Sequence, residues 1–248
     1  MSYEVEWSRV YGVDKDPVRE FLIYPVLLPE LGDLTGSVVA DFGCGNGGLL
    51  QRISGLPFAK GYGIDISAAF LEQARSLTRD PRIEFLKEDI AAKVSLASSS
   101  VDSLVSVFVL NEVQDIGPVL SECARVLKPF GRAHFVVTHP FLVAQSILHE
   151  LYKGIPLGKL SGPMNYKSRE AFDYHFTMSN AKARFYQKTF EDYVNSAYSA
   201  RLAFTKMIEM RTDDPRFEAH PRYWYDRDIP KYLYFSLAPI LPKNEESR

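Results

Sequence analysis

The chain of 248 residues has only two cysteines, Cys44 and Cys123, and no long hydrophobic run. Two cysteines cannot build a disulfide framework or a cysteine-based zinc site. No apolar stretch approaches the roughly 20 residues that a membrane-spanning helix needs, and the N-terminus lacks the apolar region of a secretory signal. We therefore expect a cytoplasmic protein that makes no use of a membrane.

An excess of one charge is also absent, because 29 Lys and Arg oppose 31 Asp and Glu for a formal net charge of −2. A protein that binds nucleic acid through a broad basic face carries a clear basic excess, so no nucleic-acid partner is expected. The five histidines lack the spacing of metal ligands, and no metal site is expected. What remains is the composition of an ordinary globular protein, with 46% hydrophobic residues and length enough for a large core.

Short apolar runs alternate with helical patterns over the first 140 residues. Apolar residues at helical spacing predict helices at 68–77, with Ser67 as the N-cap, and at 116–127. Strands are predicted at residues 37–42, 61–66, 83–86, 103–110 and 132–138. This alternation predicts an α/β protein with a parallel sheet that helices cover on both faces.

The rest of the chain divides around this core. Residues 1–36 are expected to form an N-terminal helical segment, in which a helix runs from Asp16-Pro17 through Leu22 and is then distorted by Pro25 and Pro29. Residues 37–140 form the core, and 141–188, which are too long for an ordinary connection, form an inserted cap. Residues 189–248 complete the sheet with a helix near 190–202 and strands near 204–210 and 232–238. Aromatic residues in the cap either line a pocket or build the cap's own core.

A glycine-rich turn follows the first predicted strand. Gly43, Gly45 and Gly48 satisfy the pattern G-x-G-x-x-G, which lets a ligand approach the backbone but does not identify that ligand. Asp41 stands immediately before the turn. Its carboxylate would repel a pyrophosphate and attract an ammonium or a sulfonium.

Two further acids end the next two predicted strands. Asp65 lies 24 residues after Asp41, where an acid can accept both hydroxyls of a ribose, and Asp89 lies 24 residues further on. Asp89 can accept a hydrogen bond from an adenine amino group while Ile90 packs on the ring. Open α/β sheets bind ligands at the carboxyl ends of their strands, so a cationic nucleoside is implied. Alternatively, Asp41 caps the turn, Asp65 caps the next helix and Asp89 is a solvated loop acid.

Five motifs in the expected order resemble those of the class I S-adenosylmethionine-dependent methyltransferases, in particular the small-molecule "methylase type 11" group. They are VVADFGCGNG, GYGIDIS, IEFLKEDI, SVDSLVSVFVLNEVQD and ARVLKPFGRAHFVVTHP, within residues 37–140. The resemblance implies a Rossmann-like, doubly wound seven-stranded sheet whose last strand is antiparallel. It implies S-adenosylmethionine as the cofactor and S-adenosylhomocysteine as its product. The cofactor-binding residues that it implies are Tyr11, Asp41, Gly43, Gly45, Asp65, Ile66, Asp89, Ile90 and Phe108.

Methyl transfer from a sulfonium is an in-line displacement that needs neither a metal nor a covalent intermediate. Alignment of the reactants can supply roughly 7–11 kcal/mol, whereas a general base adds a factor of about 10²–10⁴. His139 directly follows the fifth predicted strand and is either such a base or a residue that shapes the pocket. Asn111 and Glu112 follow the fourth strand and are expected to form the pocket floor or to bind substrate.

The expected function is therefore methyl transfer to O or N of a small molecule, apolar or aromatic in character, with specialised metabolism as its setting. One alternative is an NAD(P)-binding Rossmann oxidoreductase, and another is a methyltransferase-like protein that binds the cofactor without transferring the methyl group. A protein or tRNA methyltransferase is disfavoured by the missing basic cluster. The identity of the substrate and the oligomeric state stay open.

Overall fold

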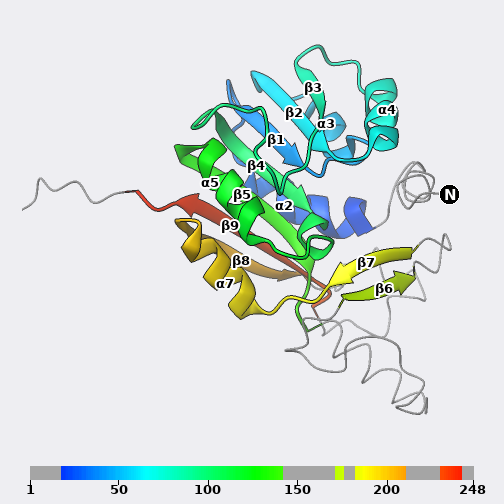
Figure 1. The fold of residues 1–248 in the computed structure, drawn as a ribbon. Helices are drawn as coiled ribbons and strands as arrows, with labels where there is room; N and C mark the ends of the chain where they lie inside the picture. The colour runs from blue at the N-terminus through cyan, green and yellow to red at the C-terminus, as the bar shows by residue number, and fades with distance from the viewer. Residues whose placement is uncertain (1–17, 142–170, 176–181, 211–229, 242–248) are drawn as a thin grey trace, which may run out of the picture.

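A computed structural model describes residues 18–141, 171–175, 182–210 and 230–241 (Figure 1). Seven strands form one sheet in the order β3-β2-β1-β4-β5-β9-β8, in which β9 is antiparallel to both of its neighbours. The α/β fold with a seven-stranded, doubly wound sheet is thus confirmed. The strands of this sheet are β1 (Val38–Phe42), β2 (Lys60–Asp65), β3 (Ile83–Lys87), β4 (Val101–Val107), β5 (Leu127–Thr138), β8 (Leu202–Met210) and β9 (Tyr232–Pro239).

Helices cover both faces of the sheet and bury a separate apolar cluster on each (Figure 1). On one face lie α5 (Gly117–Val126) and α7 (Phe190–Ser199), which contact each other. On the other face lie the segments η1 (Arg19–Ile23), α2 (Tyr24–Glu30), α3 (Gly48–Ile53) and α4 (Ala68–Leu77). Within the described ranges, no helix has the length and apolar character needed to cross a membrane.

Local sequence signals set the beginnings of two helices. The Ser67 hydroxyl accepts a hydrogen bond from the Phe70 N–H and caps α4, at the residue that the sequence predicts. Thr189 and Asp192 form a reciprocal capping box at the start of α7. Each cap satisfies backbone donors that a helix terminus leaves without a partner.

Several predicted boundaries are wrong. The fourth strand ends at Val107 rather than at residue 110, because Phe108 turns into the left-handed region with φ 69° and a short 3₁₀ segment, η2 (Val109–Asn111), follows. Strand β5 begins at Leu127 rather than at residue 132 and runs through Pro129. In α2, Pro25 occupies the helix start, where a missing N–H costs nothing, so the helix continues to Glu30.

Within the proposed cap, the structure describes one pair of strands. Strands β6 (Ala171–His175) and β7 (Lys182–Tyr186) form an antiparallel hairpin that the sequence did not predict. Residues 142–170 and 176–181 of the proposed cap lie outside the described residues (Figure 1). The division of the chain into a core and a cap therefore stays a prediction.

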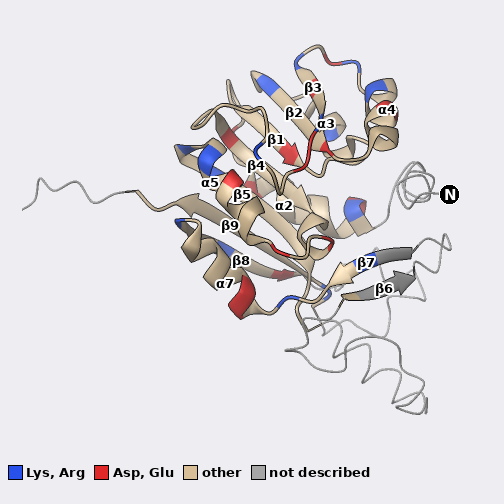
Figure 2. Cartoon of the chain, in the orientation of Figure 1, with Lys and Arg blue, Asp and Glu red and all other residues tan. Residues whose placement is uncertain are grey.

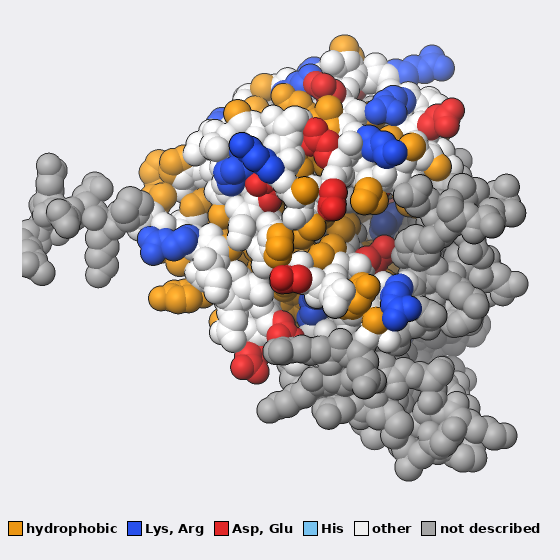
Figure 3. All heavy atoms as spheres, viewed as in Figure 1, with side chains coloured by type: hydrophobic (Ala, Val, Ile, Leu, Met, Phe, Trp, Pro, Cys, Tyr) orange, Lys and Arg blue, Asp and Glu red, His pale blue; other side chains and the backbone are white. Residues whose placement is uncertain are grey.

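Basic and acidic side chains alternate over the face of the molecule that carries α5 and α7 (Figures 2 and 3). On that face, the described residues show no groove or strip in which Lys and Arg gather.

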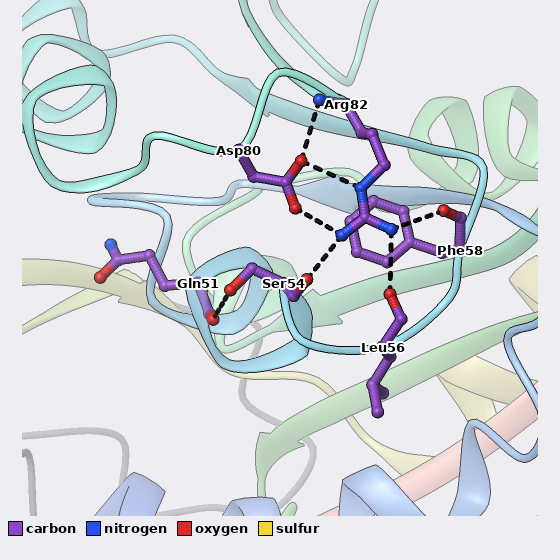
Figure 4. Close-up of polar contacts among 6 residues, drawn as sticks. All are labelled: Gln51, Ser54, Leu56, Phe58, Asp80 and Arg82. Atoms are coloured by element: carbon purple, nitrogen blue, oxygen red, sulfur yellow. Dashed lines mark hydrogen bonds and ion pairs between the residues drawn. The ribbon is translucent and has the colours of Figure 1, made fainter.

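Arg82 holds the amino end of the sheet together, far from the strand tips where α/β sheets bind ligands. Its guanidinium donates to the carbonyl oxygens of Ser54, Leu56 and Phe58, which leave α3 and enter β2 (Figure 4). It also pairs with both carboxylate oxygens of Asp80 and stacks over the Phe58 ring, 4.1 Å from its centroid. The planar, five-donor geometry of arginine permits all of these contacts at once.

We predict that Arg82→Ala lowers the midpoint of thermal unfolding by several degrees. Arg82→Lys should lower it almost as much, because a single ammonium cannot reach the carbonyls and the carboxylate together. Glu84→Ala, which removes only the exposed ion pair with Lys60 in the neighbouring strand, is the control and should leave the midpoint unchanged. Circular dichroism or calorimetry measures the midpoints, and a wild-type value for the lysine variant would contradict the prediction.

Candidate functional site

The three acids predicted from the sequence lie along one edge of the sheet. Asp41 is in β1, Asp65 ends β2 and Asp89 follows β3, and these three strands are parallel neighbours. Figure 2 shows acidic residues at the tips of the strands at this carboxyl edge. Since adjacent strands lie about 4.8 Å apart, the edge brings all three acids within the length of one nucleoside.

The glycine turn after β1 is closed on one side and open on the other. A Cβ on Gly43, whose φ is +75°, would lie 2.1 Å from the Cγ2 atom of Val109. Glycine is therefore needed there so that the loop after β4 can pack on the turn. At Gly45, with φ +54°, no heavy atom of the described residues lies within 4 Å of the corresponding position. A ligand can thus approach the backbone at Gly45.

Asp65 joins the glycine turn to the start of α4. Its Oδ2 atom accepts a hydrogen bond from the Gly45 N–H at 2.8 Å, and its Oδ1 atom accepts one from the Ser67 N–H at 2.8 Å. These two bonds fix the orientation of the carboxylate, which is half-buried.

Asp41 is the most perturbed acid of this edge. Its side chain is 4% exposed, and the described residues supply no hydrogen bond to its carboxylate. Its pKa is raised to about 7, mainly by burial; the guanidinium of Arg19 in η1 opposes this rise, and the nearby charge of Asp65 adds to it. Buried polar groups normally have hydrogen-bond partners, so a buried acid without one is a candidate ligand-binding group.

The residues predicted to surround an adenine differ in their exposure. Asp89 is exposed and its Oδ1 atom accepts a hydrogen bond from the Ala91 N–H at 2.9 Å. Ile90 is 6% exposed and belongs to the apolar cluster that α5 and α7 cover. Ile66 is 58% exposed directly beside Asp65, and is the side chain with free apolar surface at this end of the edge.

A strained turn follows β4. Phe108 has φ 69°, which is uncommon for a bulky residue, and its N–H donates to the carbonyl of Val136 at 2.7 Å. Its ring lies 5.2 Å from that of Tyr232. Such strain persists only where the surrounding structure imposes it, and it is common at functional sites.

Of the two polar residues after β4, Asn111 is buried and its Oδ1 atom accepts a hydrogen bond from the Thr138 N–H at 2.9 Å. The side chain therefore ties the turn after β4 to the end of β5. Glu112 is half-buried at the end of the same turn. The roles predicted for both residues stay predictions.

His139 lies at the end of β5 and is 2% exposed. Its Nδ1 atom accepts a hydrogen bond from the Phe141 N–H at 3.2 Å, so Nε2 carries the proton and donates to Glu209 at 3.2 Å. Burial lowers the pKa of His139, and the hydrogen bond and charge of Glu209 partly oppose that shift. Both ring nitrogens are engaged within the protein, which favours the pocket-shaping role over the base.

Sequence reasoning missed the long-range partners of this edge. They are Arg19 in η1, Glu209 in β8 and Lys188 in the segment before α7. Lys188 is 6% exposed, donates to the carbonyl of Val113, and has a pKa that burial lowers to about 8. No local pattern marks these residues, because their partners are distant in sequence. Tyr11, the predicted contact of the methionine carboxylate, lies outside the described residues.

The described residues contain no group of His, Cys, Asp and Glu that could hold a metal ion. Cys44, within the glycine turn, is buried, and burial raises the pKa of its thiol well above the usual range. It is therefore a packing residue and not a nucleophile. The chemistry that this edge can support is the binding of a positively charged nucleoside by carboxylates and an open backbone turn.

Comparison with known proteins gives the same picture. Residues 40–135 match the family model described as a methyltransferase domain. A demethylmenaquinone methyltransferase of Chlorobaculum parvum is 32% identical over 140 residues, covering 55% of this chain and 55% of that protein. A ubiquinone biosynthesis O-methyltransferase of Xanthomonas oryzae pv. oryzae is 34% identical over 106 residues, covering 40% and 42%. The chain thus spans about half the length, or less, of these curated relatives.

Solved structures extend the likeness in fold over most of the chain. The structure of an S-adenosylmethionine-dependent methyltransferase from Mesorhizobium loti superposes with a TM-score of 0.70 at 22% identity. The superposition covers 86% of this chain and 96% of that one.

We predict that Asp41→Asn stabilises the ligand-free protein above neutral pH. The folded-state pKa of Asp41 is raised to about 7, so the stability that its protonated form contributes is complete below about pH 4 and is lost as pH rises through about 7. Above pH 8 the amide should therefore increase the free energy of unfolding by about 2–4 kcal/mol. Urea unfolding between pH 5 and pH 8.5 measures it.

Asp89→Asn is the matched control, because this acid lies at the same sheet edge but is exposed. Its unfolding curves should follow those of the wild type at every pH. Equal stabilities of Asp41→Asn and wild type above pH 8 would show that the Asp41 carboxylate is not destabilised by burial.

Proposed function

We propose that this chain, whose residues 40–135 belong to the methyltransferase domain family, transfers a methyl group from S-adenosylmethionine to O or N of a small molecule. The observation that carries the proposal is the buried Asp41 carboxylate, which has no hydrogen bond from the described residues and lies beside the open turn at Gly45. A cationic ligand group would supply the hydrogen bond that the described residues do not give this acid. A diphosphate in the same place would be repelled.

The residues of the edge fit the three parts of such a cofactor. Asp41 and Gly45 would hold the methionine part, near the Arg19 guanidinium whose charge acts on Asp41. Asp65 would accept the ribose hydroxyls in the orientation that its hydrogen bonds from the Gly45 and Ser67 N–H groups set. Asp89 would accept from the adenine amino group, with the exposed side chain of Ile66 against the ring. When bound, the cofactor supplies an electrophilic methyl group on a sulfonium.

The protein's own contribution to transfer is alignment. The turn at Phe108 is fixed by its hydrogen bond to Val136, and Asn111 ties that turn to Thr138 at the end of β5. These bonds fix the part of the sheet edge that would lie between the bound methyl donor and the molecule that accepts the methyl group. Positioning of this kind can supply roughly 7–11 kcal/mol without a general base. We assign His139 to the wall of the acceptor site, since both of its nitrogens are engaged.

We propose that the acceptor is an apolar or aromatic small molecule. The aromatic rings of Phe108, Tyr232, His139 and Phe141 lie at the acceptor side of the edge. The relatives described above, a demethylmenaquinone methyltransferase and a ubiquinone biosynthesis O-methyltransferase, favour a phenolic or quinol hydroxyl. A screen with radiolabelled methyl donor against phenols, hydroquinones and amines identifies the acceptor and separates an enzyme from a protein that only binds the cofactor.

Calorimetric titration of the purified chain with S-adenosylmethionine, S-adenosylhomocysteine and NADH tests the cofactor. We expect both sulfur nucleosides to bind with micromolar affinity and NADH to show no binding, because its pyrophosphate would face Asp41. Binding of NADH alone would replace the proposal with a nicotinamide oxidoreductase.

Asp65→Ala should weaken the binding of S-adenosylhomocysteine by about 1.5–3 kcal/mol, because charge-assisted hydrogen bonds to the ribose are lost. The substitution also releases the Gly45 and Ser67 N–H groups, so a second ligand is needed to isolate the ribose. A 2′-deoxy analogue should bind the wild type more weakly than S-adenosylhomocysteine does, and the two ligands should bind the variant alike. If the variant still binds S-adenosylhomocysteine more tightly than the 2′-deoxy analogue, the ribose hydroxyl is bound by a residue other than Asp65.

A further inference from the structure

The connection between β3 and β4 contains no helix or strand, yet it is held rigidly. Residues 88–100 bury the side chains of Ile90, Val94 and Leu96 against α5. Asp89, at the start of the connection, is the acid that the proposed function assigns to adenine. An irregular segment has no ladder of backbone hydrogen bonds, so the position of Asp89 depends on the contacts that anchor this connection.

Two side chains of α5 provide that anchor. The Oε1 atom of Glu122 accepts a hydrogen bond from the Val94 N–H at 2.8 Å, and the Arg125 guanidinium donates to the Val94 carbonyl at 3.1 Å. Both backbone polar groups of Val94 are therefore bonded by side chains, as a neighbouring strand would bond them. Arg125 also donates to the Ser98 hydroxyl, and its own carbonyl accepts from the Ser99 N–H.

The anchor is an ion pair whose acid is buried and whose arginine is half-buried. Glu122 is 7% exposed, and Arg125 donates to both of its carboxylate oxygens. Burial raises the pKa of Glu122, but the hydrogen bonds from Arg125 and Val94 outweigh burial and the net shift is downward. An ion pair in such a place is often no more stable than apolar packing, so its presence calls for a role in specifying geometry.

Short bonds carry this geometry from Val94 back to Asp89. Glu88 accepts a hydrogen bond from the Ser95 N–H at 2.9 Å, which closes the connection onto its own start. Asp89 accepts from the Ala91 N–H through its side chain and from the Ala92 N–H through its carbonyl. The orientation of the Asp89 carboxylate is thus linked to the two α5 side chains through a few backbone units.

We propose that Glu122 and Arg125 are positioning residues for the purine end of the cofactor site, acting through Val94 to orient Asp89 and Ile90. This inference rests on the proposed function. It makes α5, which contributes no residue to the edge itself, responsible for discrimination between an adenine amino group and a purine carbonyl. An Asp89 held in place accepts from the amino group of adenine and repels the carbonyl oxygen of hypoxanthine.

The test compares S-adenosylhomocysteine with S-inosylhomocysteine, in which a carbonyl replaces the amino group, by calorimetry on the full chain. The wild type should prefer the adenine ligand strongly. Glu122→Gln keeps the size of the side chain, but it removes the charge and replaces the Oε2 acceptor with an NH₂ donor that faces the Arg125 Nε–H, so the two-oxygen pairing with Arg125 is lost. We expect the preference for adenine to fall about tenfold, the size of effect that one lost charge-assisted hydrogen bond gives.

Asp102→Asn is the matched control. Asp102 also accepts a backbone N–H, that of Val38, and also pairs with a cation, Lys128. It does so at the amino end of the sheet, so its loss should reduce stability and leave the ligand preference unchanged. A merely structural role for Glu122 would give the same pattern as this control.

An unchanged preference in a folded Glu122→Gln variant would overturn the inference. If that variant does not fold, Arg125→Lys provides the second test, because it keeps the charge but loses the bond to the Val94 carbonyl, and the same fall is expected. Failure of the wild type to bind S-adenosylhomocysteine would instead reject the proposed function, which distinguishes the two.

Discussion

The parallel pairing of β1 with both β2 and β4 is the constraint on which the site depends. The chain builds the sheet outward from β1 to β3 and then returns to β4 on the other side. The segments that follow β1 and β4 therefore start side by side, and an open α/β sheet binds its ligand at this position. Gly43 is the contact between them, because only a residue without a side chain leaves room for Val109.

The free energy of folding is not spread evenly over this structure. At the carboxyl edge, Asp41 is buried with no hydrogen bond from the part of the chain that the structure describes, and Phe108 adopts a strained conformation; both features reduce stability. At the amino edge, Arg82 satisfies several carbonyls and Asp102 pairs with Lys128. The strained groups lie where a ligand would bind and the well-paired groups lie at the opposite end. This distribution is typical of a protein that uses unfavourable local structure for recognition.

Much of the core could be predicted because its signals are local. A strand that ends in an acid, a glycine turn and a capped helix each occupy about ten consecutive residues, and the helix at 68–77 was predicted to the residue. The predicted boundaries failed where a tertiary contact overrides the local pattern. The apolar run 103–110 reads as one strand, but the hydrogen bond from Phe108 to Val136 turns the chain after Val107. The strand β5 begins at Leu127, although Pro129 in its sequence suggests a loop.

The carboxyl edge of the sheet has a half proposed to bind the methyl donor and a half proposed to bind the acceptor. These halves also differ in whether their signals are local in the sequence, and this difference explains which roles can be assigned. The donor half uses residues that lie within a few positions of a strand end, so their types and spacing are visible in the sequence. The acceptor half is built from pairs that are far apart, such as His139 with Glu209 and Lys188 with Val113. Each pair joins the end of a parallel strand to an element of the last third of the chain. Under the proposed function, the cofactor would therefore be specified by contiguous motifs, and the acceptor by how the C-terminal elements dock. Proteins that share the motifs can accordingly share a methyl donor while differing in the molecule that receives the methyl group.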